Sequence, residues 1–335
     1  MQIALDAMAG DHGPEDLIAG ALLAAEQAGL EVSLVGDERL LQDYVNRLAP
    51  APEISDLIKI VHSSQVIEMN EHPVDAIRKK KDSSVMVAFD LLKQGKVEAV
   101  VSAGNSGATM AAGVRKLGRL NGVSRPGIAS VFPTLKKPVI LMDIGANVDC
   151  RPQHLFQFAV MASAFSRILD ISNPSVGLLT IGEETGKGNN LVKETFPLLQ
   201  NSSLNFIGNV EGRDVFQGNV DVIVCDGFVG NICLKISEGL AEAAMVMLRD
   251  EILKSWTAKL GYLLARPAFK RFGKRVDYAT YGGAPLLGLA GTGIICHGKS
   301  SSEAIKNAII EASKMVKHNI NQDIQRSLNS EENRV

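Results

Sequence analysis

Short apolar segments alternate with helical patterns along most of the chain. Nearly every position in these segments is hydrophobic, which is typical of strands covered on both faces of a parallel sheet. Because helical patterns separate most of them, we expect right-handed crossovers and a doubly wound, mostly parallel α/β sheet. The expected strands are residues 2–7, 31–36, 57–63, 97–103, 127–134, 138–144, 175–182, 204–210 and 220–227, with two short strands within 281–298.

Two stretches depart from this alternation. A turn at Lys136–Lys137–Pro138 joins two adjacent strands and predicts either an antiparallel hairpin or an excursion at the sheet edge. Residues 230–275 have a helical pattern with no strand in it, and Gly261 and Pro267 predict a break. We therefore expect one α/β domain over 1–335, from which 230–275 protrudes as a helical hairpin.

The other helices are expected between the strands. They cover 14–28, 38–48, 74–80, 84–94, 107–117 and 152–169, and a closing helix runs from about Ser302 to Leu328.

Composition excludes several classes of protein. The 335 residues are 46% hydrophobic and 21% charged, as in ordinary soluble proteins, and the net charge of −2 argues against a general nucleic-acid binder. The four cysteines have no CxxC or zinc-finger spacing, so we expect a reduced, cytoplasmic setting. The N-terminus has no signal-peptide pattern, and no apolar run reaches the roughly 18 residues that span a bilayer.

The charge is unevenly distributed along the chain. Residues 249–275 contain eight Lys or Arg and two Asp or Glu, a local charge of +6, so the remainder carries −8. The same segment contains the only tryptophan, Trp256.

Six loops that follow expected strands share an unusual composition. They are residues 6–14, 102–108, 143–149, 182–189, 208–214 and 225–231. Five of them contain at least two glycines, and all contain Asp, Asn, Glu, Ser or Thr. Since the carboxyl ends of parallel strands meet at one edge, we expect the six loops to lie together and to bind a small anion through backbone amides. The alternative is that such loops are glycine-rich whatever they bind.

Most motifs for other chemistries are absent from the sequence. GxGxxG does not occur, which disfavours the usual nicotinamide or flavin site, whereas residues 293–300 (GIICHGKS) match GxxxxGK[ST] by pattern. GxSxG and HExxH are also absent. His297 follows an expected strand and is a candidate ligand contact.

Several of these loops resemble the PlsX family of acyl-ACP:phosphate acyltransferases. The matching segments, in the order expected of that family, are LDAMAGDHGP, VSAGNSGA, DIGANVDCRP, GNVEGRD, VCDGFVGN, YGGAPLLG and HGKSSSEAI, and IEMNEHPVDAIRKKKDSS at 67–84 is also similar. The resemblance extends from Met1 to about residue 320. One departure is Ala9, where the family usually has glycine.

The resemblance implies a Rossmann-like fold, a homodimer, no cofactor and peripheral association with the cytoplasmic membrane. It also implies transfer of a fatty acyl group from acyl carrier protein to inorganic phosphate, which gives acyl phosphate for phospholipid synthesis. Phosphate is itself a competent nucleophile. Such an enzyme therefore mainly holds phosphate against the thioester carbonyl and stabilises the oxyanion.

We expect the SAGNSG turn (residues 102–107) and the DIGAN turn (residues 143–147) to form the phosphate site together. The candidate phosphate- or substrate-binding residues are Gly104, Asn105, Ser106, Gly107, Asp143, Asn147, Asp226 and His297. The two aspartates are expected to orient the donors. Lys187 and Asn231 are the candidate catalytic residues, and the family resemblance supports both. The alternative for Lys187 is an ordinary exposed loop lysine.

The basic hairpin has two candidate partners, an acidic acyl carrier protein and an anionic membrane. The candidate contact residues are Trp256, Leu260, Leu263, Leu264, Arg266 and Lys270. We expect membrane contact at the hairpin tip, near residues 257–265. A dimer interface is the alternative for the first helix of the hairpin.

Two other functions remain open at this stage. A phosphotransacetylase-like enzyme would use acyl-CoA with the same phosphate site, but CoA requires no protruding basic hairpin. A non-catalytic anion-binding or membrane scaffold would not need so many loops rich in hydrogen-bond donors.

Overall fold

The computed structural model describes residues 1–11, 13–276 and 282–333. Within them, eleven strands form one sheet in the order β3-β2-β1-β4-β11-β10-β5-β6-β9-β7-β8. The strands are β1 (Gln2–Asp6), β2 (Glu31–Gly36), β3 (Ile58–His62), β4 (Ala99–Ser102), β5 (Gly127–Phe132), β6 (Val139–Met142), β7 (Ser175–Leu179), β8 (Asn205–Val210), β9 (Val222–Val224), β10 (Ala284–Leu287) and β11 (Thr292–Ile295). All the expected strands are present, although Tyr281, at the start of the range expected for the last two, lies outside the described residues.

The sheet consists of two parallel halves that run in opposite directions. Strands β3, β2, β1, β4 and β11 are parallel to one another, as are β6, β9, β7 and β8. Between the halves, β10 is antiparallel to both β11 and β5, and β5 is antiparallel to β6. The mostly parallel sheet and the β5–β6 hairpin are therefore confirmed.

This reversal makes one prediction wrong. The loops after β1 and β4 lie at one edge of the sheet, whereas those after β6, β7, β8 and β9 lie at the other. The six glycine-containing loops thus form two groups instead of one. The turn at residues 136–138 indicated that β5 is antiparallel to β6. The apolar pattern of β10 resembles that of the parallel strands, so it did not indicate that β10 is antiparallel to both β11 and β5.

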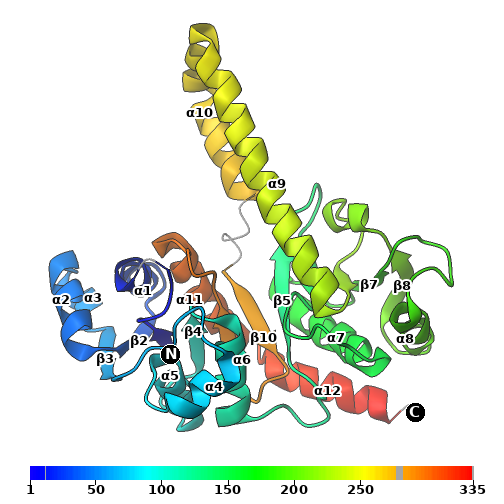
Figure 1. Ribbon diagram of the computed structural model, residues 1–335, viewed down its shortest axis with the longest axis horizontal. Helices are drawn as coiled ribbons and strands as arrows, with labels where there is room; N and C mark the ends of the chain where they lie inside the picture. The colour runs from blue at the N-terminus through cyan, green and yellow to red at the C-terminus, as the bar shows by residue number, and fades with distance from the viewer. Residues whose placement is uncertain (12, 277–281, 334–335) are drawn as a thin grey trace.

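Helices cover both faces of the sheet, as the fully buried central strands require (Figure 1). They are α1 (Pro14–Ala28), α2 (Glu38–Leu48), α3 (Pro52–Ser55), α4 (Pro73–Lys79), α5 (Ser84–Lys93), α6 (Ser106–Leu117), α7 (Pro152–Phe165), α8 (Asn190–Gln200), α9 (Gly227–Lys254), α10 (Trp256–Val276), α11 (Ser302–Lys317) and α12 (Ile320–Glu332), with 3-10 turns at Ser166–Leu169 and Gly212–Phe216.

The closing segment forms two helices instead of the single one expected from Ser302 to Leu328. Asn319 has a φ of 53°, which ends the α11 segment and starts α12 in a new direction. Asparagine tolerates this left-handed conformation better than most residues do, so the break has a local cause.

The helical hairpin projects away from the sheet as α9 and α10 (Figure 1). Its turn is at Ser255, which is extended (φ −130°, ψ 135°), whereas Gly261 and Pro267 lie inside α10. The Ser255 carbonyl accepts a hydrogen bond from the N–H of Lys259 (3.0 Å) and so starts the second helix. The predicted break was therefore misplaced, and residues 257–265 form the first turns of α10 beside the tip.

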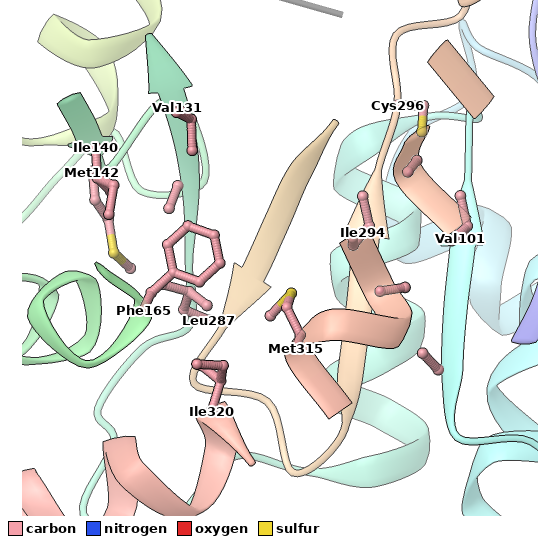
Figure 2. Packing of buried hydrophobic residues seen from close by; sticks show 14 of the residues in the cluster. Val101, Val131, Ile140, Met142, Phe165, Leu287, Ile294, Cys296, Met315 and Ile320 are labelled. Atoms are coloured by element: carbon pink, nitrogen blue, oxygen red, sulfur yellow. The ribbon is translucent and has the colours of Figure 1, made fainter. Parts of the chain in front are cut away.

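One buried apolar cluster runs through both halves of the sheet. It joins Val101 of β4 and Ile294 of β11 to Met142 of β6. In Figure 2, Met315 of α11 and Phe165 of α7 lie among these strand residues. The shared core holds the two sets of strand-end loops in fixed positions relative to each other.

Candidate active site

The turn after β6 is built around the fully buried carboxylate of Asp143. Its Oδ1 accepts hydrogen bonds from the N–H groups of Ile128 (3.0 Å) and Ala146 (3.1 Å). Its Oδ2 accepts from the N–H (2.7 Å) and the Nδ2 (3.0 Å) of Asn147. The Asn147 Nδ2 also donates to the Pro126 carbonyl (2.8 Å), so both amide hydrogens of Asn147 are used within the protein.

The start of α9 packs directly on this turn. A Cβ at Gly227 would lie 2.7 Å from the Asn147 carbonyl oxygen, and a Cβ at Gly230 would overlap the Asp143 carbonyl oxygen. The Gly227 N–H donates to the Asn147 carbonyl (2.8 Å). Only glycine at positions 227 and 230 allows this approach. The approach fixes the N-terminus of α9, which is the positive end of a long helix dipole, beside the DIGAN turn.

Asp226 and Asn231 lie on either side of this close contact. Asp226 caps α9, since its Oδ1 accepts a hydrogen bond from the Val229 N–H (2.9 Å). The Asn231 side chain is exposed and packs over Gly145, where a Cβ would lie 3.5 Å from the Asn231 Oδ1. Asn231 therefore presents an amide at the N-terminus of α9, in the group of loops that contains Asp143.

Lys187 lies in the loop after β7, the strand next to β9. Its stem packs over Gly182, where a Cβ would lie 3.3 Å from the Lys187 Cγ. The loop turns through Gly186 and Gly188, both at positive φ (93° and 101°). The Lys187 ammonium is exposed and has no ion-pair partner among residues 1–11, 13–276 and 282–333.

Burial suppresses thiol ionisation around the DIGAN turn. It raises the pKa of Cys150 to about 11 and raises the pKa of the buried Cys225 well above its ordinary value. Burial also raises the pKa of Asp143, while its four hydrogen-bond donors oppose the rise. Neither thiol forms a thiolate nucleophile near neutral pH.

The SAGNSG turn belongs to the other group of loops. Asn105 caps α6, since its Oδ1 accepts a hydrogen bond from the Ala108 N–H (3.0 Å). Its Nδ2 donates to the carbonyls of Met69 and Glu71 (3.0 Å each), so both amide hydrogens of Asn105 are also donated within the protein. Ser106 is exposed at the first position of α6, where helix N–H groups have no intrahelical partner.

Glycine again permits tight packing in this turn. The Gly104 N–H donates to the Ser102 Oγ (3.2 Å), and that Oγ donates to the buried Asp6 carboxylate (2.8 Å). A Cβ at Gly107 would lie 2.7 Å from Cγ of Pro73. Burial raises the pKa of Asp6, which lies beneath the turn.

His297 joins the same group from the end of β11. The next residue, Gly298, accepts a hydrogen bond from the Asp11 N–H (2.8 Å) through its carbonyl, which holds the loops after β1 and β11 together. His297 is exposed. It therefore lies with the SAGNSG turn and not in the group that contains Lys187 and Asn231.

The predicted site is thus divided between the two edges of the sheet. Asp143, Asn147, Asp226, Lys187 and Asn231 emerge at one edge, and the SAGNSG turn with His297 emerges at the other. Asn105 and Asn147, predicted as side-chain phosphate contacts, spend their amide donors on folding their own turns. Any phosphate contact from these turns therefore comes from backbone N–H groups or, in the SAGNSG turn, from the exposed Ser106 hydroxyl.

Two arginines beside the DIGAN turn were missed. Arg125 Nη1 donates to the Asp149 carbonyl (3.1 Å), and the Arg151 N–H donates to the His154 Nδ1 (3.1 Å). Burial, followed by the charges of Arg125 and Arg151, lowers the pKa of His154. The predicted β5–β6 hairpin could have revealed Arg125, because it places the start of β5 beside the end of β6.

Arg213, in the loop after β8, is a further cation at this edge. It forms ion pairs with Glu183 (3.3 Å) and Glu211 (3.2 Å), which neutralise much of its charge. Lys187 is therefore the better placed of the two to bind an anion. No cluster of three or more His, Cys, Asp or Glu that could hold a metal occurs in the described part of the chain.

The predicted hairpin contacts lie on two faces of α10. Trp256, Leu260, Leu263 and Leu264 form an exposed apolar stripe, of which Leu264 is 79% exposed. Arg266 and Lys270 instead line a groove of about 710 Å³ against α9, together with Tyr262 and Phe269. Among the described helices, none is long and apolar enough to cross a membrane.

Similarity to known proteins covers nearly the whole chain. The family model described as "Fatty acid synthesis protein" matches residues 1–323. A phosphate acyltransferase of Pelobacter propionicus is 56% identical over 311 residues, which are 92% of this chain and 89% of the relative. A phosphate acyltransferase of Geotalea uraniireducens is 53% identical over 324 residues, 96% of this chain and 92% of the relative.

The fold is also found among solved structures. The EutD phosphotransacetylase of Staphylococcus aureus superposes with a TM-score of 0.61 over 94% of each chain, at 17% sequence identity. At this identity the likeness concerns the fold, and it confirms the Rossmann-like α/β class. Together with the close relatives, it leads to one conclusion: the chain belongs to the PlsX family of phosphate acyltransferases and is an enzyme that acts on phosphate.

Proposed function

We propose that this enzyme transfers a fatty acyl group from acyl carrier protein to inorganic phosphate, which gives acyl phosphate for phospholipid synthesis. The observation that carries the proposal is the grouping of the α9 N-terminus, Asn231 and the exposed Lys187 at the ends of neighbouring strands. A helix N-terminus and a free ammonium both attract an anion. The family description, which concerns fatty acid synthesis, supports a fatty acyl group.

In the proposed reaction, a phosphate oxygen attacks the thioester carbonyl carbon. The tetrahedral intermediate carries an oxyanion, and its collapse breaks the C–S bond and releases the carrier thiol after protonation. Lys187 binds phosphate or the oxyanion, and the Asn231 amide donates to the same charge. Holding the two reactants together lowers the barrier by several kcal/mol, and one oxyanion donor contributes roughly 10²–10³ in rate.

The hairpin favours acyl carrier protein over acyl-CoA as the acyl donor. Acyl carrier proteins are acidic, and the segment 249–275 has the opposite charge, with Arg249, Lys254 and Arg271 among its exposed side chains. A phosphotransacetylase-like reaction with acyl-CoA is the alternative, and the S. aureus neighbour carries that name. Comparing the two donors on the same enzyme separates these functions.

The hairpin also supports two proposals about assembly. Ile236, Leu240 and Met247 are exposed on one face of α9, which suits a homodimer. The stripe of Trp256, Leu260, Leu263 and Leu264 suits peripheral contact with an anionic cytoplasmic membrane, because basic residues flank it. The enzyme then works in the cytoplasm at the membrane surface.

Substitution of Lys187 tests the proposed chemistry. Lys187→Ala should lower acyl phosphate formation by at least about 10²-fold, by loss of anion stabilisation. Lys193→Ala removes another exposed lysine, from α8, and serves as the matched control. Near-normal turnover by Lys187→Ala with an intact fold would contradict the role given to this residue.

A further inference from the structure

Large apolar side chains are exposed around the polar groups at the ends of β6, β9 and β7. Ile181 is 83% exposed, Val148 59%, Phe228 57% and Ile232 41%. We call these four residues the apolar rim. Exposed apolar patches of this kind commonly mark a binding surface.

Each rim residue adjoins a group of the candidate active site. Val148 follows Asn147, and Ile232 follows Asn231. Phe228 follows Gly227, whose N–H donates to the Asn147 carbonyl (2.8 Å).

Ile181 adjoins the site on the β7 side. It precedes Gly182, over which the stem of Lys187 packs. The strands β6, β9 and β7 are neighbours in the sheet, and adjacent strands lie about 4.8 Å apart. The rim therefore follows one short edge of the sheet.

The backbone that carries three of the rim residues is held in place by the site itself. The Asp143–Asn147 network fixes the turn that carries Val148. The overlap that a Cβ at Gly230 would cause fixes the start of α9, which carries Phe228 and Ile232. Val148, Phe228 and Ile232 are therefore carried by fixed backbone at this edge.

We propose that the apolar rim binds the fatty acyl chain of the substrate and sets the preference for long chains. The proposal rests on the proposed function and specifies its substrate. A narrow acyl chain covers the rim and leaves Lys187 and Asn231 free for phosphate. A second copy of the chain seated there would bury the exposed Lys187 ammonium, which is costly.

Rates with acyl carrier proteins loaded with saturated chains of 4 to 16 carbons test the rim. Ile181→Ala and Ile232→Ala should each lower kcat/KM for the 16-carbon donor about 10-fold and that for the 4-carbon donor less than about 2-fold, because only the long chain covers the removed methyl groups. Ile207→Ala is the matched control, since Ile207 is 49% exposed on β8 and lies outside the rim. It should leave the whole chain-length profile unchanged.

Two results would overturn the proposal. One is that Ile181→Ala and Ile232→Ala lower kcat/KM equally at every chain length. The other is that these variants no longer sediment as a dimer while their chain-length profile is unchanged, and that result would assign the rim to an interface between copies. If wild-type enzyme makes no acyl phosphate from any donor, the proposed function fails on its own. Binding of a fluorescent 16-carbon fatty acid then tests the rim directly, with weaker binding by Ile181→Ala expected and unchanged binding contradicting it.

Discussion

Gly230 lies so close to Asp143 that a Cβ at position 230 would overlap the Asp143 carbonyl oxygen. This contact joins the N-terminus of α9 to the DIGAN turn. Gly230→Ala should therefore destabilise the protein by about 2–3 kcal/mol or more, because the backbone must shift to relieve the overlap. Gly239→Ala is the control, since Gly239 lies in α9 with open space around it and should gain about 0.5–1 kcal/mol.

Urea unfolding of the two variants measures this difference. The account requires a lower midpoint for Gly230→Ala and an equal or higher one for Gly239→Ala. Equal stability of Gly230→Ala and wild type would show that α9 is not fixed to the turn in this way.

Asp6 should make the stability depend on pH. Burial raises the pKa of Asp6, so the folded state holds the proton more firmly than the unfolded state. The contribution of Asp6 to stability is therefore complete below about pH 4 and is lost as pH rises through the folded-state pKa. Asp6→Asn removes this loss, so the free energy of unfolding of the variant should rise relative to that of wild type as pH rises.

Unfolding free energies measured between pH 4 and 8 check the slope. Asp56→Asn, at an exposed position, should follow the wild-type profile. Parallel profiles for Asp6→Asn and wild type would mean that the Asp6 carboxyl is not perturbed by burial.

The cysteines should be unreactive in the folded enzyme. Burial raises the pKa of Cys150 to about 11 and that of Cys296 to about 12. At pH 8 the thiolate fraction of Cys150 falls roughly 10²-fold below that of a free cysteine. Iodoacetamide labelling followed by mass spectrometry should show slow modification in the native protein and rapid modification in urea. Fast native labelling of Cys150 would reopen the possibility of a thiolate in the site.

Membrane contact should depend on the apolar stripe of α10. The double variant Leu263→Glu with Leu264→Glu should no longer float with vesicles that contain anionic lipid, because two charges enter the contact surface. Both side chains are exposed, so the fold should persist in circular dichroism. Leu198→Glu, on α8, is the control and should float like wild type. Unchanged flotation of the double variant would remove the membrane role.

The sequence was sufficient for the strands, the sheet class and the hairpin, because apolar runs and helical periodicity arise from local burial. It was sufficient for the antiparallel β5–β6 pair but not for the direction of β10. β10 and β5 are as apolar as the parallel strands, and their antiparallel pairing reverses half of the sheet. The hairpin turn was also misplaced, because Pro267 is accommodated within α10 while Ser255 adopts an extended backbone.

For the candidate site, too, local properties were predictable from the sequence and long-range contacts were not. Sequence reasoning found the loops that carry Lys187, Asn231 and Asp143, since strand-end position and residue type are local properties. It did not find that Asn147 and Asn105 spend their amide hydrogens on neighbouring groups, which depends on Pro126 and on distant carbonyls. Whether residues 1–335 form a single domain stays a prediction.

The central claim is that inorganic phosphate accepts an acyl group from acyl carrier protein at this site. The most direct measurement incubates the full-length enzyme with hexadecanoyl carrier protein and phosphate and quantifies acyl phosphate and free carrier, beside a reaction with the corresponding acyl-CoA. The account predicts equal amounts of the two products, dependence on phosphate, and a clear preference for the carrier-bound donor. Phosphate-independent release of the carrier, or equal or better use of acyl-CoA, would contradict it.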